Sequence, residues 1–204
     1  MRDCQMPIDF ERKIAFIHIP KVAGTTIEHR YNLRHEEKFF AKSRKAYEFD
    51  GVTYAPQHLT PKYLGELVPG LDTFSLFCFV RHPYEKLVSE YYWLHKDVYQ
   101  EPIKRWSERK FRQWLVNHAS KKNMDHLINQ WEYAKGCDHV FRLEYLERDI
   151  KLIDHWFGVD PNTPLLHSKK GNNTTQKAQC LTKRTRDLIY SIWREDFDKL
   201  QFNR

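Results

Sequence analysis

The apolar residues of the chain are concentrated in two short runs, Ile14–Ile19 and Thr73–Val80. Both runs are rich in β-branched and aromatic residues and show no regular polar alternation, which is typical of strands buried in a parallel sheet. Elsewhere the apolar positions recur every three or four residues, the spacing of amphipathic helices. The pattern predicts a third short strand at Val140–Leu143 and helices at Thr25–Leu33, Pro61–Val68, Ile150–Phe157 and Thr182–Leu200.

The middle of the chain, Glu101–Gly136, is predicted to be helical because two apolar stripes run through it. The stripes are formed by Phe111, Trp114 and Leu115 and by Leu127, Ile128 and Trp131. Arg34–Val52 has no clear period and is predicted as an irregular excursion, and Pro161–Thr175 as a loop. The sequence therefore predicts one domain over residues 1–204, a three-layer α/β fold with a short parallel sheet flanked by helices.

The first strand leads into a segment suited to binding an anion. Pro20 cannot donate to a sheet ladder and ends the strand. Gly24 allows a tight turn, and Thr25 and Thr26 follow where a helix N-cap belongs, with hydroxyls and amides that bind anionic oxygens. Lys21 adds a full charge. A Walker P-loop requires GxxxxGK[ST], so that motif is absent, and an ordinary strand–helix turn with a surface lysine is the alternative.

The second strand ends in a similar unit. Arg81 stands at its carboxyl end, the edge at which open α/β sheets bind ligands, and Pro83 suits the first turn of the next helix. Ser89 lies eight residues after Arg81, about two helical turns further on. A guanidinium and a hydroxyl so placed are suited to holding one phosphate.

Together the two units resemble the cofactor segments of the sulfotransferases that use 3′-phosphoadenosine 5′-phosphosulfate (PAPS). IPKVAGTT is similar to their 5′-phosphosulfate loop, and FVRHPYEKLVSEYY to their 3′-phosphate segment. The loop is most similar to the PK-x-x-G-T/S form of the carbohydrate branch, which includes the heparan and chondroitin enzymes. Weaker similarities continue in the same order as far as Phe202. One residue departs from the pattern, because Lys86 stands where the family commonly has arginine.

The resemblance implies a P-loop-like fold and a PAPS site. The residues it assigns to this site are Lys21, Val22, Ala23, Gly24, Thr25, Thr26, Arg81 and Ser89. HSKKGNNTT is similar to a late segment that closes over the nucleotide, which adds Lys170 and Asn173; an ordinary surface loop is the alternative for either residue. The implied acceptor is a hydroxyl of a sugar or glycoconjugate, not a nucleic acid.

Sulfuryl transfer to a hydroxyl needs positive charge at the leaving phosphate and a base for the acceptor proton. Lys21 is the candidate for the first role. His58, in YAPQHLTP, resembles a histidine that family members carry between the two cofactor segments, and an unperturbed imidazole suits general-base work near neutrality. The alternative for His58 is a loop histidine that holds a backbone carbonyl, and His126 is the second choice of base. The reaction requires no metal.

Other ionisable residues are predicted to be structural. His18 lies inside the first strand and is expected in the core, and His82 is expected in a turn as readily as in a chemical role. Glu28 and Glu66 fall on helical faces and are expected to be solvated.

Two other function classes are alternatives: a basic nucleic-acid-binding protein and a P-loop-like nucleotide kinase or NTPase. A net charge of +7 is compatible with an anionic cofactor, an anionic acceptor or nucleic acid. A P-loop-like kinase or NTPase is disfavoured because the second strand ends in Arg81 where a Walker B strand ends in aspartate. The chain shows no apolar run long enough to span a membrane and no apolar region of a signal peptide. The expectation is thus a cytoplasmic, bacterial-type enzyme, or a chain from which a membrane anchor has been removed.

Overall fold

The computed structural model describes residues 7–33, 46–95, 106–165 and 174–204. Its main sheet has the strand order β1-β2-β5-β6, formed by Ile8–Asp9, Ile14–Phe16, Ser75–Val80 and His139–Arg142. The strands β2, β5 and β6 are parallel, and β1 is antiparallel to β2. The carboxyl ends of the three parallel strands therefore lie at one edge of the sheet.

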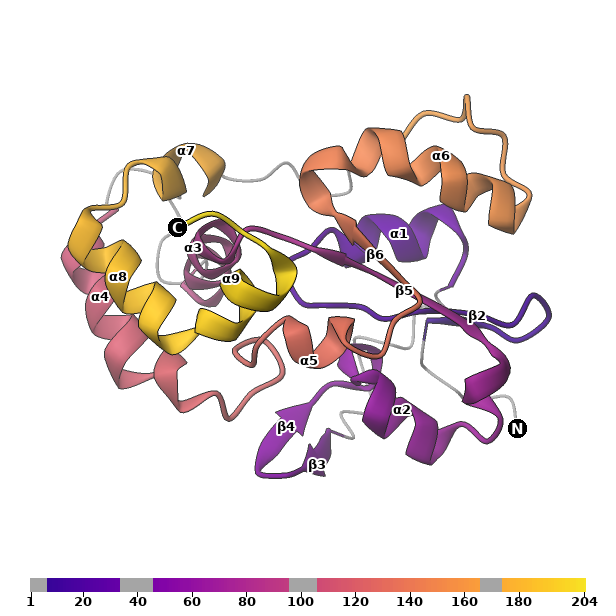
Figure 1. Ribbon diagram of the computed structural model, residues 1–204, viewed down its shortest axis with the longest axis horizontal. Helices are drawn as coiled ribbons and strands as arrows, with labels where there is room; N and C mark the ends of the chain where they lie inside the picture. Colours follow the sequence, from indigo (N-terminus) through magenta and orange to yellow (C-terminus); the bar gives the residue numbers. More distant parts are fainter. Residues whose placement is uncertain (1–6, 34–45, 96–105, 166–173) are drawn as a thin grey trace.

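Helices cover both faces of this sheet (Figure 1). On one side lie α1 (Gly24–Arg30) and α6 (Leu146–Phe157), and on the other lie α2 (Pro61–Leu67) and α5 (Trp131–Ala134). Phe77 of β5 contacts the rings of Trp156 and Phe157 from α6, and Tyr31 stacks on Phe157 from the end of α1. The mixed α/β fold with a parallel sheet flanked by helices is thereby confirmed.

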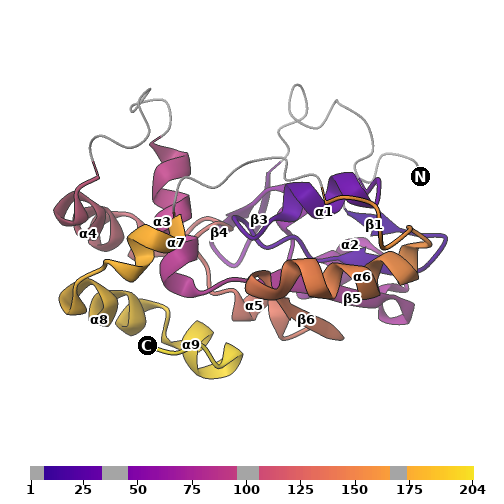
Figure 2. The same cartoon turned by 90° about the horizontal axis from the view of Figure 1, so that it is seen from above.

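The remaining helices pack beside the sheet as a group. They are α3 (Pro83–Leu94), α4 (Glu108–Asn117), α7 (Thr174–Gln179), α8 (Lys183–Ile192) and α9 (Arg194–Leu200). Figures 1 and 2 both show α7 alongside α3. A hairpin of β3 (Tyr47–Phe49) and β4 (Val52–Tyr54) leads into the 3₁₀ turn η2 (Pro56–His58). Among the described residues, no helix combines the length and apolar character needed to cross a bilayer.

The prediction of a helix through Leu127 and Ile128 was wrong. Both side chains are buried, but the segment from Met124 to Gln130 is formed of turns before α5. Its backbone bonds partly to β4, with the N–H of Asp125 donating to the carbonyl of Thr53 at 3.0 Å, and partly within a single turn, with the N–H of Leu127 donating to the carbonyl of Met124 at 2.9 Å. Consecutive buried turns can place apolar residues at the spacing expected of a helix, so periodicity could not separate the two.

Two other helix boundaries differ from the prediction. The single helix expected over Thr182–Leu200 is broken at Trp193, whose φ of −112° and ψ of 33° end α8 and start α9. The Trp193 indole N–H donates to the Leu127 carbonyl at 2.9 Å, so a tertiary contact fixes the break. The predicted loop Pro161–Thr175 ends early, because α7 begins at Thr174.

The first two strands are shorter than predicted, the third is shifted by one residue, and further strands are present. β2 ends at Phe16, although Ile17 still donates to the Phe77 carbonyl at 2.8 Å. The two-residue β1 and the hairpin β3–β4 were missed because segments of two or three residues carry too little pattern. Residues 34–45 of the predicted excursion lie outside the described residues.

Candidate functional site

The loop between β2 and α1 has an uncommon backbone. Lys21 and Ala23 both have φ in the left-handed region, at 67° and 55°, which is rare for residues other than glycine. Ala23 is the N-cap of α1, so the prediction that a threonine caps this helix was wrong; Thr25 and Thr26 lie within its first turn. Left-handed residues at such a loop turn successive backbone N–H groups toward one concavity, a geometry that favours anions.

Gly24 is required here by a neighbouring side chain. A Cβ at this position would lie 1.9 Å from Nε2 of His18, and Gly24 itself is not in the left-handed region. The tight turn that the sequence attributed to Gly24 is made instead by Lys21 and Ala23. His18 is buried, as predicted, and its Nδ1 lies 2.5 Å from Oε1 of Glu28. Glu28 is therefore buried and bonded, and the prediction that it is solvated was wrong.

Three histidines, His18, His58 and His126, form what we call the imidazole cluster. The ring of His58 makes edge contacts with both others, at centroid distances of 4.6 Å to His18 and 5.0 Å to His126. Trp93 of α3 stacks on His126 at 4.8 Å, and Nζ of Lys21 lies 5.2 Å from the centre of the Trp93 ring. The structure therefore brings Lys21, His58 and His126 into one assembly, from segments far apart in sequence.

His58 is held by a buried carboxylate. Its Nδ1 lies 2.8 Å from Oδ2 of Asp125, and the same carboxylate accepts the backbone N–H groups of Ala55 and His126 at 2.8 Å and 2.7 Å. Burial lowers the pKa of His58 to about 4, against the opposing effect of Asp125. Burial alone would raise the pKa of Asp125, but the hydrogen bond from His58, the nearby His58 and His126 rings and the Ala55 N–H together outweigh it and leave that pKa lowered. The pair is thus a neutral imidazole beside an ionised carboxylate, not the unperturbed imidazole expected from the sequence.

His126 has an equivalent partner on α3. Its Nδ1 lies 2.7 Å from Oε2 of Glu90, which is fully buried. The other carboxylate oxygen of Glu90, Oε1, has no hydrogen-bond partner among the described residues. Lys86, the residue that departs from the family pattern, is buried one turn earlier and donates to the His126 carbonyl at 2.6 Å. Burial lowers the pKa of Lys86, and the charge of Glu90 opposes that shift.

Arg81 stands after β5 as predicted, and α7 packs against it. Its guanidinium donates to Oε2 of Glu85 at 3.1 Å and to Oγ1 of Thr174 at 2.7 Å. One turn along α7, Nζ of Lys177 lies 4.0 Å from the centre of the Tyr92 ring. That ammonium is buried and has no hydrogen-bond partner in the described part of the chain, and burial lowers the pKa of Lys177.

The other predicted site residues are placed as follows. Ser89 lies on α3 three residues before Tyr92, so these two share one side of the helix, while Arg81 precedes the helix N-cap His82. His82 is the N-cap of α3 and accepts from the Tyr84 N–H, which is the turn role foreseen for it. Lys170 and Asn173 lie outside the described residues.

Sequence reasoning missed Asp125, Glu90, Trp93, Thr174 and Lys177. A signal existed for Lys177, since Thr174 and Lys177 are three residues apart and would share a face had the helix been recognised. No local signal pointed to Asp125 or Glu90, because their roles depend on tertiary contacts with His58 and His126. Two histidines of the imidazole cluster and one carboxylate, His58, His126 and Asp125, offer possible metal-ligand atoms within 4.8 Å of one another.

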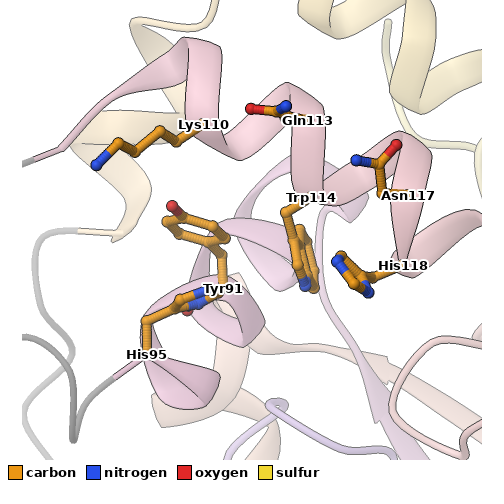
Figure 3. Close-up of a pocket in the computed structure, with 7 residues that line it drawn as sticks. All are labelled: Tyr91, His95, Lys110, Gln113, Trp114, Asn117 and His118. Carbon is orange, nitrogen blue, oxygen red and sulfur yellow. The ribbon is translucent and has the colours of Figure 1, made fainter.

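A separate open pocket of about 260 Å³ lies between α3 and α4 (Figure 3). It is lined by Tyr91, His95, Lys110, Gln113, Trp114, Asn117 and His118. Tyr91 and His95 are each two residues from Trp93 on α3, about 200° around the helix, so the pocket and the imidazole cluster lie on different sides of α3. The pocket contains none of the predicted site residues.

A family model described as the sulfotransferase family matches residues 5–203, nearly the whole chain. No curated protein and no solved structure matches the chain. The matched span contains both strand–loop–helix units, the imidazole cluster and α7, so the family assignment and the site geometry concern the same residues. The chain belongs to the sulfotransferase family.

Proposed function

We propose that the chain transfers a sulfuryl group from PAPS to a hydroxyl of a carbohydrate or glycoconjugate acceptor. Family membership supports sulfuryl transfer. The observation that supports the choice of reacting groups is that the imidazole cluster meets the segment between β2 and α1 at two points. His18 packs against Gly24, and Lys21 reaches the ring of Trp93, which stacks on His126. The carbohydrate acceptor rests on the resemblance of PKVAGT to the loop of the carbohydrate branch.

The described residues fit a donor with phosphate groups at two points. The left-handed loop at Lys21 and Ala23, followed by Thr25 and Thr26, suits the phosphosulfate end. Arg81 with Ser89, joined by Thr174 and the unpartnered Lys177 ammonium, suits the 3′-phosphate. In this loop the lysine precedes the glycine, so the Walker motif is absent. A P-loop-like fold is therefore part of the proposal.

PAPS, when bound, supplies the sulfuryl group and a phosphate leaving group. Lys21 has the charge and the flexible stem to stabilise the oxygen on which negative charge develops. His58 is neutral and bonded to Asp125 through Nδ1, which leaves the lone pair on Nε2 to accept the acceptor's hydroxyl proton. Asp125 therefore acts as a positioning residue that sets the tautomer of His58, a role comparable to the aspartate of a catalytic triad.

The test is transfer of labelled sulfate from PAPS to a panel of polysaccharides and glycosides in the presence of EDTA. We expect label on at least one carbohydrate acceptor and loss of turnover in Lys21→Ala. That variant should depress kcat more than nucleotide affinity, because the ammonium acts most strongly as charge develops. Transfer to no acceptor, combined with equal affinity for adenosine 3′,5′-bisphosphate and 5′-AMP, would contradict the proposal.

A further inference from the structure

Glu90 and Trp93 of α3 both hold the ring of His126. They are three residues apart, so they lie on one side of the helix. Glu90 is fully buried, and its Oε2 lies 2.7 Å from Nδ1 of the His126 ring. Trp93 stacks on the same ring at a centroid distance of 4.8 Å, with 23° between the planes. The indole of Trp93 therefore borders the imidazole cluster directly.

Trp93 is exposed to solvent although it borders this largely buried cluster. All six tryptophans of the chain lie in the described residues, and Trp93 is the only one of them that is exposed, at 37%. His18 and His58 are buried, with exposed fractions of 8% and 6%, and His126 is partly exposed. Exposure thus increases from His58 through His126 to Trp93. We expect the hydroxyl of an acceptor to approach His58 along this path.

Lys21 connects the same indole to the donor loop. Its Nζ lies 5.2 Å from the centre of the Trp93 ring. A ligand in contact with Trp93 is consequently close both to the lysine assigned to the leaving phosphate and to His126, whose ring contacts His58. The acceptor of an in-line transfer has to lie between the donor and the base. The contacts with His126 and Lys21 also restrain the indole, so little conformational entropy is lost when a ligand packs on it.

We propose that Trp93 binds a pyranose ring of the acceptor and thereby positions its hydroxyl at His58. One face of a pyranose presents C–H bonds, whose hydrogens carry partial positive charge and pack favourably on the electron-rich surface of an indole. The hydroxyl groups of the same sugar project from the edge of its ring, so this packing leaves them free to react. The inference rests on the proposed function, because it names the residue that recognises the acceptor of that reaction.

Binding is measured by calorimetry on the full chain in the presence of adenosine 3′,5′-bisphosphate. The probes are unsulfated hexasaccharides of chondroitin, heparosan and cellulose. We expect at least one of them to bind, and Trp93→Ala to weaken its binding about tenfold or more. Trp93→Phe should weaken it less, because a phenyl ring keeps part of the stacking surface. Leu94→Ala removes an apolar side chain of similar exposure, 38%, from the next position of α3 and should bind as the wild type does.

Nuclear magnetic resonance adds a measurement on the wild-type side chain. Each tryptophan gives one indole N–H resonance, and the resonance missing in Trp93→Phe is that of Trp93. The bound hexasaccharide should shift this resonance more than those of the buried Trp114 and Trp193. Binding that leaves the Trp93 resonance unchanged, or that survives Trp93→Ala, would overturn the inference. Binding of none of the three hexasaccharides would also overturn it.

Kinetics distinguishes recognition of the acceptor from a structural role. In the labelled-sulfate assay, Trp93→Ala should raise KM for the saccharide about tenfold and lower kcat by less, with unchanged affinity for adenosine 3′,5′-bisphosphate. An equal loss of nucleotide affinity would show that Trp93 supports the Lys21 loop and would contradict acceptor binding. A chain that binds a hexasaccharide through Trp93 but transfers no sulfate from PAPS would refute the proposed function and support the saccharide site.

Discussion

The side chain of His58 illustrates how neighbouring residues set chemistry at the residue scale. A free imidazole exchanges its proton between two nitrogens, but the buried Asp125 carboxylate confines the proton of His58 to Nδ1. Asp125 is itself fixed by two backbone N–H donors. The histidine therefore presents one nitrogen with a lone pair in a fixed direction, which is what a general base requires.

Asp125→Asn tests this arrangement with a nearly isosteric change. An asparagine can donate to Nδ1 of His58, which moves the ring proton to Nε2 and removes the lone pair that we propose acts as the base. We expect kcat to fall by about 10²- to 10⁴-fold, with product-nucleotide affinity within a few-fold of wild type. His58→Ala should lose a similar amount, and the double variant little more, because the two residues act as a unit.

Two outcomes of these kinetic measurements would contradict the expected result. Wild-type kcat in Asp125→Asn combined with a large loss in His58→Ala would refute the positioning role of Asp125. Wild-type kcat in both variants would refute His58 as the base and move the search to His126. His155→Ala, which changes an exposed histidine of α6, serves as the control.

Lys177 is a second case in which the local environment suggests a role. Its ammonium is buried over Tyr92 without a hydrogen-bond partner among the described residues, an arrangement that costs free energy in the absence of an anion. Lys177→Met keeps the stem and removes the charge. We expect unchanged or higher stability of the ligand-free protein, and affinity for adenosine 3′,5′-bisphosphate weaker by roughly 10- to 100-fold, the range of a hydrogen bond to a charged group.

Calorimetry with 5′-AMP provides the control for Lys177→Met. Affinity for this nucleotide, which lacks the 3′-phosphate, should not change. An equal loss for both nucleotides would show that Lys177 acts on the adenosine or on the fold, not on the 3′-phosphate.

At the scale of elements, α1 is fixed to α6 by a buried ion pair. The guanidinium of Arg30 donates to both carboxylate oxygens of Asp154, at 2.6 Å and 2.7 Å, and the Tyr31 hydroxyl donates to the same carboxylate at 2.8 Å. This contact holds the helix that follows the Lys21 loop. Loss of this ion pair would therefore both destabilise the packing of α1 on α6 and disturb the loop that carries Lys21.

Asp154→Asn should therefore destabilise the fold strongly. Removing one partner of a buried pair leaves the other charge uncompensated, and the typical cost is about 3–5 kcal/mol. Chemical denaturation monitored by tryptophan fluorescence measures the change in free energy of unfolding. Asp198→Asn, which breaks the exposed pair with Arg194, is the matched control and should show no clear change. Equal stability of the two variants would contradict the argument.

Glu108 joins α4 to α8 and gives a pH-dependent stability. Its carboxylate accepts from the backbone N–H and the hydroxyl of Thr182, at 3.0 Å and 2.5 Å, and from the hydroxyl of Thr185. Burial alone would raise the pKa of Glu108, but these hydrogen bonds outweigh it and leave the pKa below its ordinary value of 4.5. The unfolded chain then binds the proton more readily, so the contribution is complete above pH 4.5 and is lost as pH falls through the folded pKa.

Comparison of wild type with Glu108→Gln across pH measures this effect. The difference in free energy of unfolding should be constant near neutrality and shrink below pH 4.5. A difference that does not change in acid would show that folding leaves the pKa of Glu108 at its ordinary value.

The elements also show what the sequence could and could not predict. The strand–loop–helix units were predictable because Pro20 and Arg81, which follow the two apolar runs, are local features, although β2 itself ends at Phe16. The helix expected through Leu127 was wrong because the backbone just before it, at Asp125, bonds to β4, a partner that no local pattern reveals. For the same reason Glu28 was expected in solvent, although it bonds to His18 across the loop. Candidate residues with local motifs, such as Lys21 and His58, were found, while those defined by tertiary contact, such as Asp125, were not.

At the scale of the whole molecule, the candidate donor site connects parts of the fold that lie apart in sequence. Lys21 belongs to the loop after β2, Arg81 to the end of β5, and Lys177 to α7, which packs on α3. No one of these segments forms the site alone. A ligand that contacts all three would therefore bind the folded chain and not the unfolded one, and it would stabilise the molecule as a unit.

Adenosine 3′,5′-bisphosphate in EDTA should consequently raise the melting temperature. At 100 times its dissociation constant, a ligand specific for the folded state adds about 2.7 kcal/mol to the free energy of unfolding. In a domain of this size each kcal/mol corresponds to about 2–4 °C, so we expect a shift of roughly 5–11 °C. At the same concentration 5′-AMP should give a smaller shift, because it leaves Arg81 and Lys177 without an anion. If ATP with Mg²⁺ gave the largest shift of the three, the result would favour an NTPase and contradict a PAPS site. If the shift with the bisphosphate vanished in Arg81→Ala, the second phosphate would be located at Arg81, where α7 packs on α3.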